Sequence, residues 1–389
     1  MKILCLSTSN YYPFPTRKQN VMNRMTDAQI IYVDPPVTLI APLKDPKAQP
    51  RLSMYKQGGK VSDEHPHVTV YAQPPVLPFY NKKRAVNKVN QKRFAKYLAG
   101  ICRENGFHDD FLLWCYSPMS CDVVEPLAKE LGIDAKALWK RTVYDCVDRH
   151  SAYPGMIDPA VVDRQEEDLA SRCGVVFATA RGLYERLKGF NDNAYLIPNG
   201  AAYELFSTAA SMEKEGIAPH FGFVGMLQEC IDYDIIRAVA DCFPEGRVSL
   251  IGRALPGVDL SWIDRYPNVE YLGLLPQKEL PSKIKDFDVC LNVFADNELS
   301  KDVSPLKFYE YLATGIPIVS TPVPYQVRDY ADCIYIAEDK NDFIKQCRQA
   351  LSEPKDSPRR AARMAHGRNC SWDERVALMK EILERTGEQ

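Results

Sequence analysis

The sequence has no long hydrophobic run. None of its segments reaches the roughly 18 consecutive apolar residues that a membrane-spanning helix needs. Residues 1–9 have the pattern of a first β-strand and not that of a secretory signal peptide. We therefore expect a cytoplasmic protein without a transmembrane helix.

The cysteines do not form the pairs that mark disulfide scaffolds or zinc sites. All twelve are scattered without a C-x-x-C motif, and several, such as Cys5 and Cys290, lie inside apolar strand-like runs. This distribution is typical of reduced thiols in the core of a cytosolic protein. His65 and His67 have no cysteines clustered near them, so no zinc site is expected there.

The glycine fingerprint of dinucleotide-binding proteins is also missing. The turn after the first predicted strand, residues 8–15, contains no glycine, so G-x-G-x-x-G is absent where NAD or FAD phosphates would bind. The chain carries no recognised nucleic-acid-binding motif either. These absences argue against a dinucleotide cofactor and against nucleic acid as a partner.

The net charge of −2 conceals a strong asymmetry along the chain. Residues 1–100 contain 16 Lys and Arg against 5 Asp and Glu, so they carry +11 and the remainder carries −13. A helix predicted over residues 81–104 holds much of this positive charge, and its expected apolar stripe is Val86, Val89, Tyr97, Leu98 and Ile101. Lysine-rich helix faces are often only solvated, but the asymmetry favours contact with an anionic membrane surface. The basic residues of this helix are Lys82, Lys83, Arg84, Lys88, Lys92, Arg93 and Lys96.

Strand-like and helix-like segments alternate along nearly the whole chain. This alternation is typical of parallel, doubly wound α/β sheets, in which ligands bind beyond the carboxyl ends of the strands. Asp148, Arg149 and His150 stand at one such end. The main predicted strands are residues 2–7, 30–34, 68–71, 111–116, 141–148, 174–179, 220–225, 248–253, 269–273, 289–293 and 318–320.

Residues 302–323 are the most informative stretch. Ser304 is predicted to cap a short helix, with Pro305 as its first residue and Gly315 as its stop, before a buried strand. Lys307 opposes the positive end of the helix dipole, at a cost of a few tenths of a kcal/mol or more that an anion would relieve. Helix amides and one lysine together predict a phosphate site.

Glu310 lies on the same helix face as Lys307 and can accept two hydrogen bonds from a neighbouring diol. A pyrophosphate beside a ribose indicates a nucleotide sugar. The alternative is that Lys307 and Glu310 only pair on a solvated helix surface, where such a pair contributes about 0.2–0.5 kcal/mol.

The segment 304–315, followed by Pro317 and Val319, resembles the donor-binding signature of GT-B glycosyltransferases. It is most similar to bacterial polysaccharide enzymes of the teichuronic-acid type and more distantly to the xanthan glucuronosyltransferase. The resemblance implies two Rossmann-like, doubly wound α/β domains that face a cleft. The expected parts are an acceptor-binding domain at 1–198, a nucleotide-sugar-binding domain at 199–370, and a helix at 371–389 that crosses back to the first domain.

The same resemblance implies a hexosyltransferase of cell-surface polysaccharide synthesis, located in the cytoplasm or peripherally on the inner face of the plasma membrane. Its donor would be a nucleoside-diphosphate sugar, usually UDP-linked, and its acceptor a glycan or lipid-linked glycan, with no further cofactor. The chain departs from many retaining relatives, which have a glutamate where Asp302 stands. The donor-binding residues expected are Lys307, Glu310, Ser304, Leu306, Arg253 and Asp302.

Asp148 is the expected catalytic base of an inverting reaction, since residues 143–148 resemble the segment that carries the base in the xanthan enzyme. Its alternative role is to cap the following turn. Arg17, Lys18, Arg149 and His150 are expected to face the acceptor or the cleft.

Three further alternatives concern the chemistry. The enzyme could be a retaining transferase without a protein base, in which His150 or Arg149 holds the donor. The chain could also be a non-catalytic partner that binds a nucleotide or a glycan. The triplets Asp232/Asp234 and Asp286/Asp288 are of the kind that holds a divalent ion in another glycosyltransferase fold, but the acidic composition supplies such triplets readily, and we expect no metal there.

Overall fold

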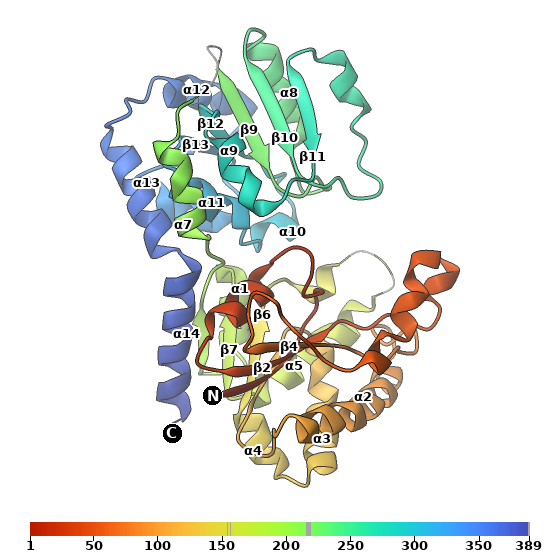
Figure 1. Ribbon diagram of the computed structural model, residues 1–389. Coiled ribbons are helices and arrows are strands. Elements are labelled where there is room, and N and C mark those ends of the chain that lie inside the picture. The colour runs from red at the N-terminus through yellow and green to blue at the C-terminus, as the bar shows by residue number, and fades with distance from the viewer. Residues whose placement is uncertain (154, 156, 215–218, 388–389) are drawn as a thin grey trace. The chain divides into compact units, whose positions relative to one another are not determined.

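The computed structural model describes residues 1–153, 155, 157–214 and 219–387 (Figure 1). The chain forms two compact units, which are described separately. Unit 1 comprises Met1–Ile197 with Val376–Gln389, and unit 2 comprises Pro198–Arg375. Within the described residues, no helix is both long and apolar enough to cross a membrane.

Unit 1 is built on an eight-stranded sheet with the order β3-β4-β2-β1-β5-β6-β7-β8, in which only the β3/β4 pair is antiparallel. The order reverses between β1 and β5. The strands are β1 (Lys2–Leu6), β2 (Gln29–Asp34), β3 (Lys60–Val61), β4 (Val68–Ala72), β5 (Leu112–Cys115), β6 (Thr142–Cys146), β7 (Val175–Ala178) and β8 (Ala194–Leu196).

The central strands of unit 1 are buried on both faces, as expected for parallel strands with apolar sequences. Leu4 of β1 pairs in register with Ile31 of β2 and Leu113 of β5, and all three side chains are fully buried. The helices are α1 (Arg17–Arg24), α2 (Arg84–Glu104), α3 (Val124–Leu131), α4 (Ala135–Lys140), α5 (Pro159–Arg172), α6 (Arg181–Lys188) and, beginning in unit 2, α14 (Trp372–Gly387).

Helix α2 buries most of the predicted apolar stripe, because Leu98 and Ile101 lie in the core and Tyr97 packs against it, but Val89 does not. Val89, expected in the apolar stripe, is 50% exposed, while the first turns bury Asn87 and Asn90. Asn87 donates to the carbonyl oxygen of Met119 at 2.9 Å, and Asn90 exchanges two hydrogen bonds with the backbone of Leu77. The prediction for Val89 is wrong because polar loops, and not an apolar surface, pack against this end of the helix.

Unit 2 contains a six-stranded, entirely parallel sheet with the order β11-β10-β9-β12-β13-β14. Its order reverses between β9 and β12, the kind of point at which open α/β sheets bind ligands. The strands are β9 (His220–Val224), β10 (Arg247–Ile251), β11 (Val269–Gly273), β12 (Val289–Asn292), β13 (Ile318–Ser320) and β14 (Tyr335–Ile336).

Helices cover both faces of this second sheet. One apolar cluster joins the strands to α8 and α12, and a second joins them to α7, α9 and α11 (Figure 1). The doubly wound α/β architecture predicted from the alternating pattern is therefore confirmed in both units. The helices are α7 (Tyr203–Phe206), α8 (Tyr233–Cys242), α9 (Leu280–Ile284), α10 (Glu298–Lys301), α11 (Leu306–Thr314), α12 (Lys340–Leu351) and α13 (Pro358–Asn369).

Candidate functional site

The N-terminal turn of α11 lies beside two glycine turns at the carboxyl ends of β9 and β10. Gly225 and Gly252 have φ angles of 144° and 143°, a region that disfavours other residues. A Cβ atom on Gly252 would lie 1.8 Å from the carbonyl oxygen of Gly225, and one on Gly225 would lie 3.3 Å from Cδ of Lys307. The glycines thus let the Gly252 turn pack against the Gly225 turn, which lies next to Lys307.

Lys307 is buried, with 7% of its surface exposed. Its ammonium group lies 4.3 Å from the ring centroids of both Phe223 and Phe294, and it forms no ion pair with any described residue. Burial lowers the pKa of Lys307 to about 7, against the weaker opposing effects of Cys230 and Glu310. The alternative of a solvated surface pair with Glu310 is therefore wrong.

Glu310 is also buried, with 8% of its surface exposed. Gln277 donates from Nε2 to Oε1 of Glu310 at 3.0 Å, and no described residue donates to Oε2. Burial raises the pKa of Glu310 to about 7, although Gln277 and the charge of Lys307 act in the opposite direction. One carboxylate oxygen thus remains for a ligand.

Ser304 does not cap α11, contrary to the prediction. The helix begins at Leu306, its N-cap position is Pro305, and no side chain caps its amides. Ser304 is engaged elsewhere, because its Oγ accepts from the amide of Asn199 at 3.1 Å and its carbonyl accepts from Nδ2 of Asn199 at 2.6 Å. The first amides of α11 are therefore left without a side-chain acceptor.

The other predicted donor-binding residues lie around this turn. Leu306 is half-buried at the start of α11, and Asp302 is half-buried at the end of α10. Arg253 is exposed directly after Gly252. The structure thus brings Lys307 next to the Gly225 turn and places Arg253 on the adjoining turn.

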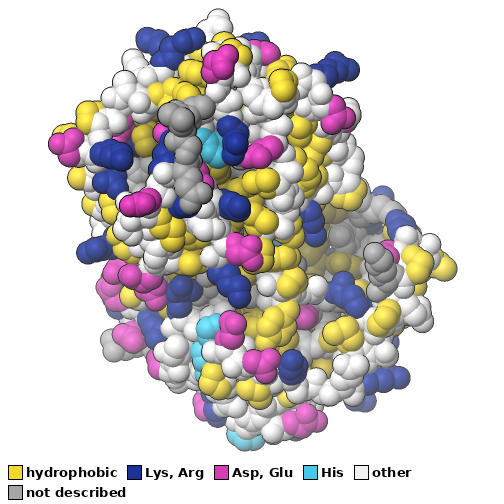
Figure 2. Space-filling model, turned by 45° about the horizontal axis from the view of Figure 1, so that its top comes forward, with side chains coloured by type: hydrophobic (Ala, Val, Ile, Leu, Met, Phe, Trp, Pro, Cys, Tyr) yellow, Lys and Arg dark blue, Asp and Glu magenta, His cyan; other side chains and the backbone are white. Residues whose placement is uncertain are grey.

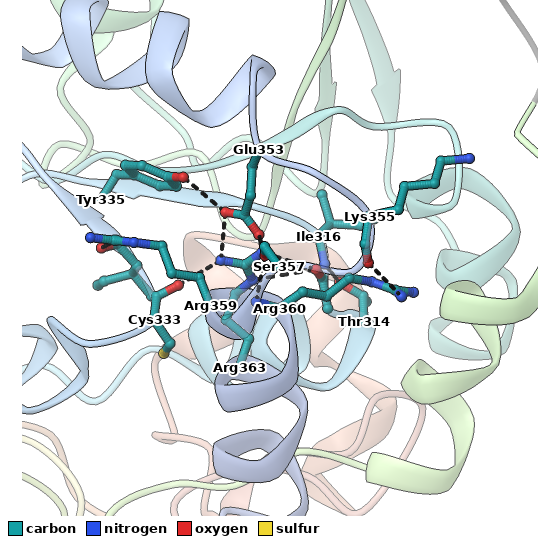
Figure 3. A network of polar contacts seen from close by, with 12 residues as sticks. Thr314, Ile316, Cys333, Tyr335, Glu353, Lys355, Ser357, Arg359, Arg360 and Arg363 are labelled. Atoms are coloured by element: carbon teal, nitrogen blue, oxygen red, sulfur yellow. Dashed lines mark hydrogen bonds and ion pairs between the residues drawn. The ribbon is translucent and has the colours of Figure 1, made fainter.

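A buried ion pair holds the opposite end of α11. Arg363 of α13 donates to the carbonyl oxygen of Gly315, where α11 ends with a φ of 71°, and it pairs with Glu353. Tyr335 of β14 donates to the same carboxylate at 2.9 Å. Figure 3 shows this network, which satisfies the final carbonyl of α11 and so fixes the helix that carries Lys307.

Unit 1 has a hollow of about 350 Å³ at the carboxyl ends of β1, β5 and β6. We call it the first hollow, and Lys18, Asp148, His150 and Tyr153 are among its lining residues. Tyr153 donates to Oδ2 of Asp148 at 2.7 Å. Asp148 is therefore held by a tyrosine hydroxyl, and among the described residues it accepts no hydrogen bond from Ser151 or from a backbone amide of the following turn.

Lys18 reaches the first hollow from a nearly dry environment, and His150 lines the hollow as a half-buried side chain. Lys18 is 8% exposed, its ammonium lies 5.6 Å from the ring centroid of Tyr116, and burial lowers its pKa against the charge of Asp148. Burial also lowers the pKa of His150, against the charge of Asp148. The Nε2 atom of His150 lies 3.1 Å from the carbonyl oxygen of Tyr116, to which it donates.

Arg17 and Arg149 do not line the first hollow. Arg17 is 1% exposed, and its Nε donates to both carboxylate oxygens of Asp145 at 2.9 and 3.0 Å. Its Nη1 donates to the carbonyl oxygen of Ile197 at 3.0 Å. Arg17 thus ties α1 to β6 instead of facing a ligand, because β6 places the buried carboxylate of Asp145 beside it. Arg149 is half-buried and precedes His150, which does line the first hollow.

The sequence and the fold match those of known proteins. A family model described as glycosyl transferase-like matches residues 233–381. TuaH of Bacillus subtilis (strain 168), described as a glycosyltransferase of teichuronic acid biosynthesis, is 24% identical over 274 residues, which are 64% of this chain and 68% of TuaH. Sucrose-phosphate synthase of Thermosynechococcus elongatus superposes with a TM-score of 0.70 at 12% identity, covering 99% of this chain and 98% of its own. The chain is a glycosyltransferase of the GT-B fold.

HepE of Anabaena shares the fold of this glycosyltransferase as well. Its TM-score is 0.67 at 14% identity, and the match covers 99% of each chain. At sequence identities this low, the structural similarity establishes the fold and does not identify the ligand-binding residues of this chain.

Several residues around Lys307 were not predicted from the sequence of the glycosyltransferase. A glycine directly after an apolar strand was a visible signal for Gly225 and Gly252. The partners Phe223, Phe294 and Gln277 carry no local signal, because each reaches Lys307 or Glu310 only through the packing of distant segments.

The aspartate triplets of the glycosyltransferase are engaged in structural contacts. Asp232 caps α8 by accepting from the amides of Asp234 and Ile235 at 3.0 and 3.1 Å, and Asp288 accepts from the amide of His220 at 2.8 Å. Within the described ranges, one group of metal-type ligands lies close together, namely Asp332, Cys333 and His366. Asp332 and His366 already pair at 3.0 Å, and burial raises the pKa of Cys333 to about 12, which disfavours the thiolate that binds metals.

Proposed function

We propose that this glycosyltransferase moves a sugar from a UDP-linked donor to a glycan or lipid-linked acceptor during bacterial cell-surface polysaccharide synthesis. The description of TuaH supports the pathway class, and HepE, which was solved with UDP and glucose, supports the donor class. The observation that carries the proposal is Lys307, a buried lysine beside the uncapped start of α11 that pairs with none of the acidic groups the structure describes.

The donor diphosphate binds Lys307 and the first amides of α11, and Arg253 supplies a second cation. Negative charge on the leaving diphosphate grows in the transition state, so these preorganised donors accelerate the bond cleavage without a metal ion. Oε2 of Glu310 accepts from the ribose diol. Asp302 contacts hydroxyl groups of the donor sugar, while Leu306 and Ser304 shape the turn.

The acceptor hydroxyl binds in the first hollow, where Asp148 acts as the base of an inverting reaction. The hydroxyl oxygen forms a bond to the anomeric carbon, the bond to the diphosphate breaks, and Asp148 receives the hydroxyl proton. Oδ2 of Asp148 is held by Tyr153, which leaves Oδ1 for the acceptor. Retention of configuration without a protein base, with His150 holding the donor sugar, is the competing course.

Helix α2 supports peripheral binding to the anionic inner face of the plasma membrane. Arg84 is not part of this surface, because it is half-buried and pairs with Asp122 and Asp168. Over the face shown in Figure 2, Lys and Arg are interspersed with Asp and Glu, whereas exposed cations follow one another just before α2 and along its first turns. Each contributes about 1 kcal/mol near an anionic lipid surface. They are Lys82, Lys83, Lys88, Lys92, Arg93 and Lys96.

The test is a screen of UDP-sugars for slow hydrolysis, followed by transfer to candidate acceptors and anomeric analysis of the product by NMR. Lys307→Ala and Glu310→Gln should weaken UDP binding measured by calorimetry, whereas the exposed Lys345→Ala on α12 should not. Unchanged UDP affinity in both site variants, or no release of UDP from any donor, would refute the proposal.

A further inference from the structure

A second hollow adjoins the first one in unit 1. Its volume is about 250 Å³, and it lies at the carboxyl ends of β2 and β4, whereas the first hollow lies at the ends of β1, β5 and β6. Pro35 and Gln73 line both hollows, so the two are neighbours along one edge of the sheet.

We propose that the second hollow binds an uncharged sugar unit of the acceptor, next to the unit that receives the transferred sugar. The enzyme would then extend glycans that already contain at least two sugars. This inference rests on the proposed function, because the base Asp148 lines the first hollow and defines the position of the reacting unit.

Asp34 supplies the acceptor atoms of this site. It ends β2, and its Oδ1 accepts from the amide of Tyr11 at 2.8 Å, while no described residue donates to its Oδ2. Burial raises the pKa of Asp34 to about 6, against the Tyr11 amide and the charge of Arg51. The side chain is therefore mostly ionised at pH 7, and one carboxylate oxygen remains to accept from sugar hydroxyls.

Other residues that line the second hollow supply hydrogen-bond donors. Arg51 donates from Nη2 to Oδ1 of Asn10 at 3.1 Å, which orients the amide group of Asn10 and leaves the other guanidinium N–H groups for a ligand. Gln73 adds a second amide. Sugar hydroxyls both donate and accept hydrogen bonds, so a hollow lined by a carboxylate, amides and a guanidinium matches their chemistry.

Tyr12 adds an aromatic surface. It is 48% exposed, and its ring is held edge-on against Tyr11 with centroids 4.9 Å apart. An amphipathic ring of this kind can pack against the C–H face of a pyranose while its surroundings bind the hydroxyls. A phosphate or uronate is disfavoured, because the charge of Arg51, the cation among the lining residues, is offset by the nearby carboxylate of Asp34; a second cation, Lys60, has its ammonium group 6.0 Å from the ring centroid of Tyr12.

The chain contains a reporter for each hollow, because Met54 lines the second and Met119 the first. We suggest labelling the methionine methyl groups of the full-length protein with ¹³C and assigning the two signals with Met54→Leu and Met119→Leu. The probes are methyl glycosides of glucose, galactose and N-acetylglucosamine, each compared with matched disaccharides. We expect monosaccharides to shift Met119 alone and at least one disaccharide to shift Met54 and Met119 together.

Asp34→Asn should weaken disaccharide binding roughly ten- to a hundred-fold, the usual effect of losing a hydrogen bond to a charged group, and should leave the monosaccharide shift of Met119 intact. The exposed Asp63→Asn is the matched control. If Asp34→Asn fails to fold, Asn10→Ala tests the same site and should weaken disaccharide binding in the same direction.

The outcomes separate the inference from the proposed function. If sugars shift Met119 and never Met54, or if Asp34→Asn and Asn10→Ala bind disaccharides like the parent, the second site is refuted while the function stands. A Met54 shift in a protein that transfers nothing supports the site and refutes the function. If inorganic pyrophosphate shifts the Met54 signal, the second hollow binds an acceptor diphosphate and the sugar assignment is overturned. If none of the sugars tested shifts either methionine signal, both the second site and the proposed acceptor site are overturned.

Discussion

Binding of UDP should draw a proton onto Lys307. In the free protein, burial lowers the pKa of this lysine to about 7, so at pH 8 roughly nine-tenths of it is neutral. A bound diphosphate brings negative charge against the ammonium group and should return its pKa toward the ordinary value of about 10.4. Binding at pH 8 should therefore take up about 0.9 proton at this residue.

The sign and size of the pH dependence follow from this uptake. Because the bound state holds more protons than the free state between pH 7 and 10, affinity should fall as the pH rises, by about ninefold between pH 8 and pH 9. Other groups contribute little in this range. Glu310, with a pKa of about 7, is mostly ionised at pH 8, as is a terminal phosphate with a second pKa of about 6.

Calorimetry in buffers with different ionisation enthalpies measures the proton uptake directly. At pH 8 the parent protein should take up close to one proton more than Lys307→Met, and the affinity of the variant should depend far less on pH. Equal proton uptake by the two proteins, with measurable binding in both, would show that the diphosphate does not contact Lys307.

Three further results are expected. Lys307→Met should raise the melting temperature of the ligand-free protein at pH 6–7, as measured by calorimetry. The reason is that the pKa of Lys307 is lower in the folded state than in the unfolded state, so keeping the buried ammonium charged opposes folding at this pH. The gain in melting temperature should vanish above about pH 10, and its absence at pH 6 would contradict the burial argument. Asp148→Asn should lower turnover about 10²–10⁴-fold while UDP affinity and melting temperature hold, and turnover within a few-fold of the parent would favour the retaining course. Neutralising four exposed lysines at and just before the start of α2, namely Lys82, Lys83, Lys88 and Lys92, should release the protein from anionic vesicles in a sedimentation assay. Added salt should do the same, since surface charges are screened over about 10 Å at 0.1 M, whereas salt-independent binding would argue against this surface.

The sequence alone was enough for the elements whose formation depends on neighbouring residues. Gly315 ends α11 in the left-handed conformation, as predicted, and residues 318–320 form the strand expected after it. Backbone dihedral preferences, caps and apolar periodicity act over a few residues, so these features are visible in one dimension. Lys307 was conspicuous for the same reason, because its conflict with the helix dipole is local.

Tertiary structure decided how the same residues are used. Ser304 is diverted from capping by Asn199, which lies 105 positions away, and Arg17 is withdrawn into the core by Asp145, 128 positions away. The burial that lowers the pKa of Lys307 on α11 likewise depends on Phe223, which lies on β9. Desolvation and pairing of a side chain depend on which distant segments pack against it, and nothing in the neighbouring sequence specifies those segments.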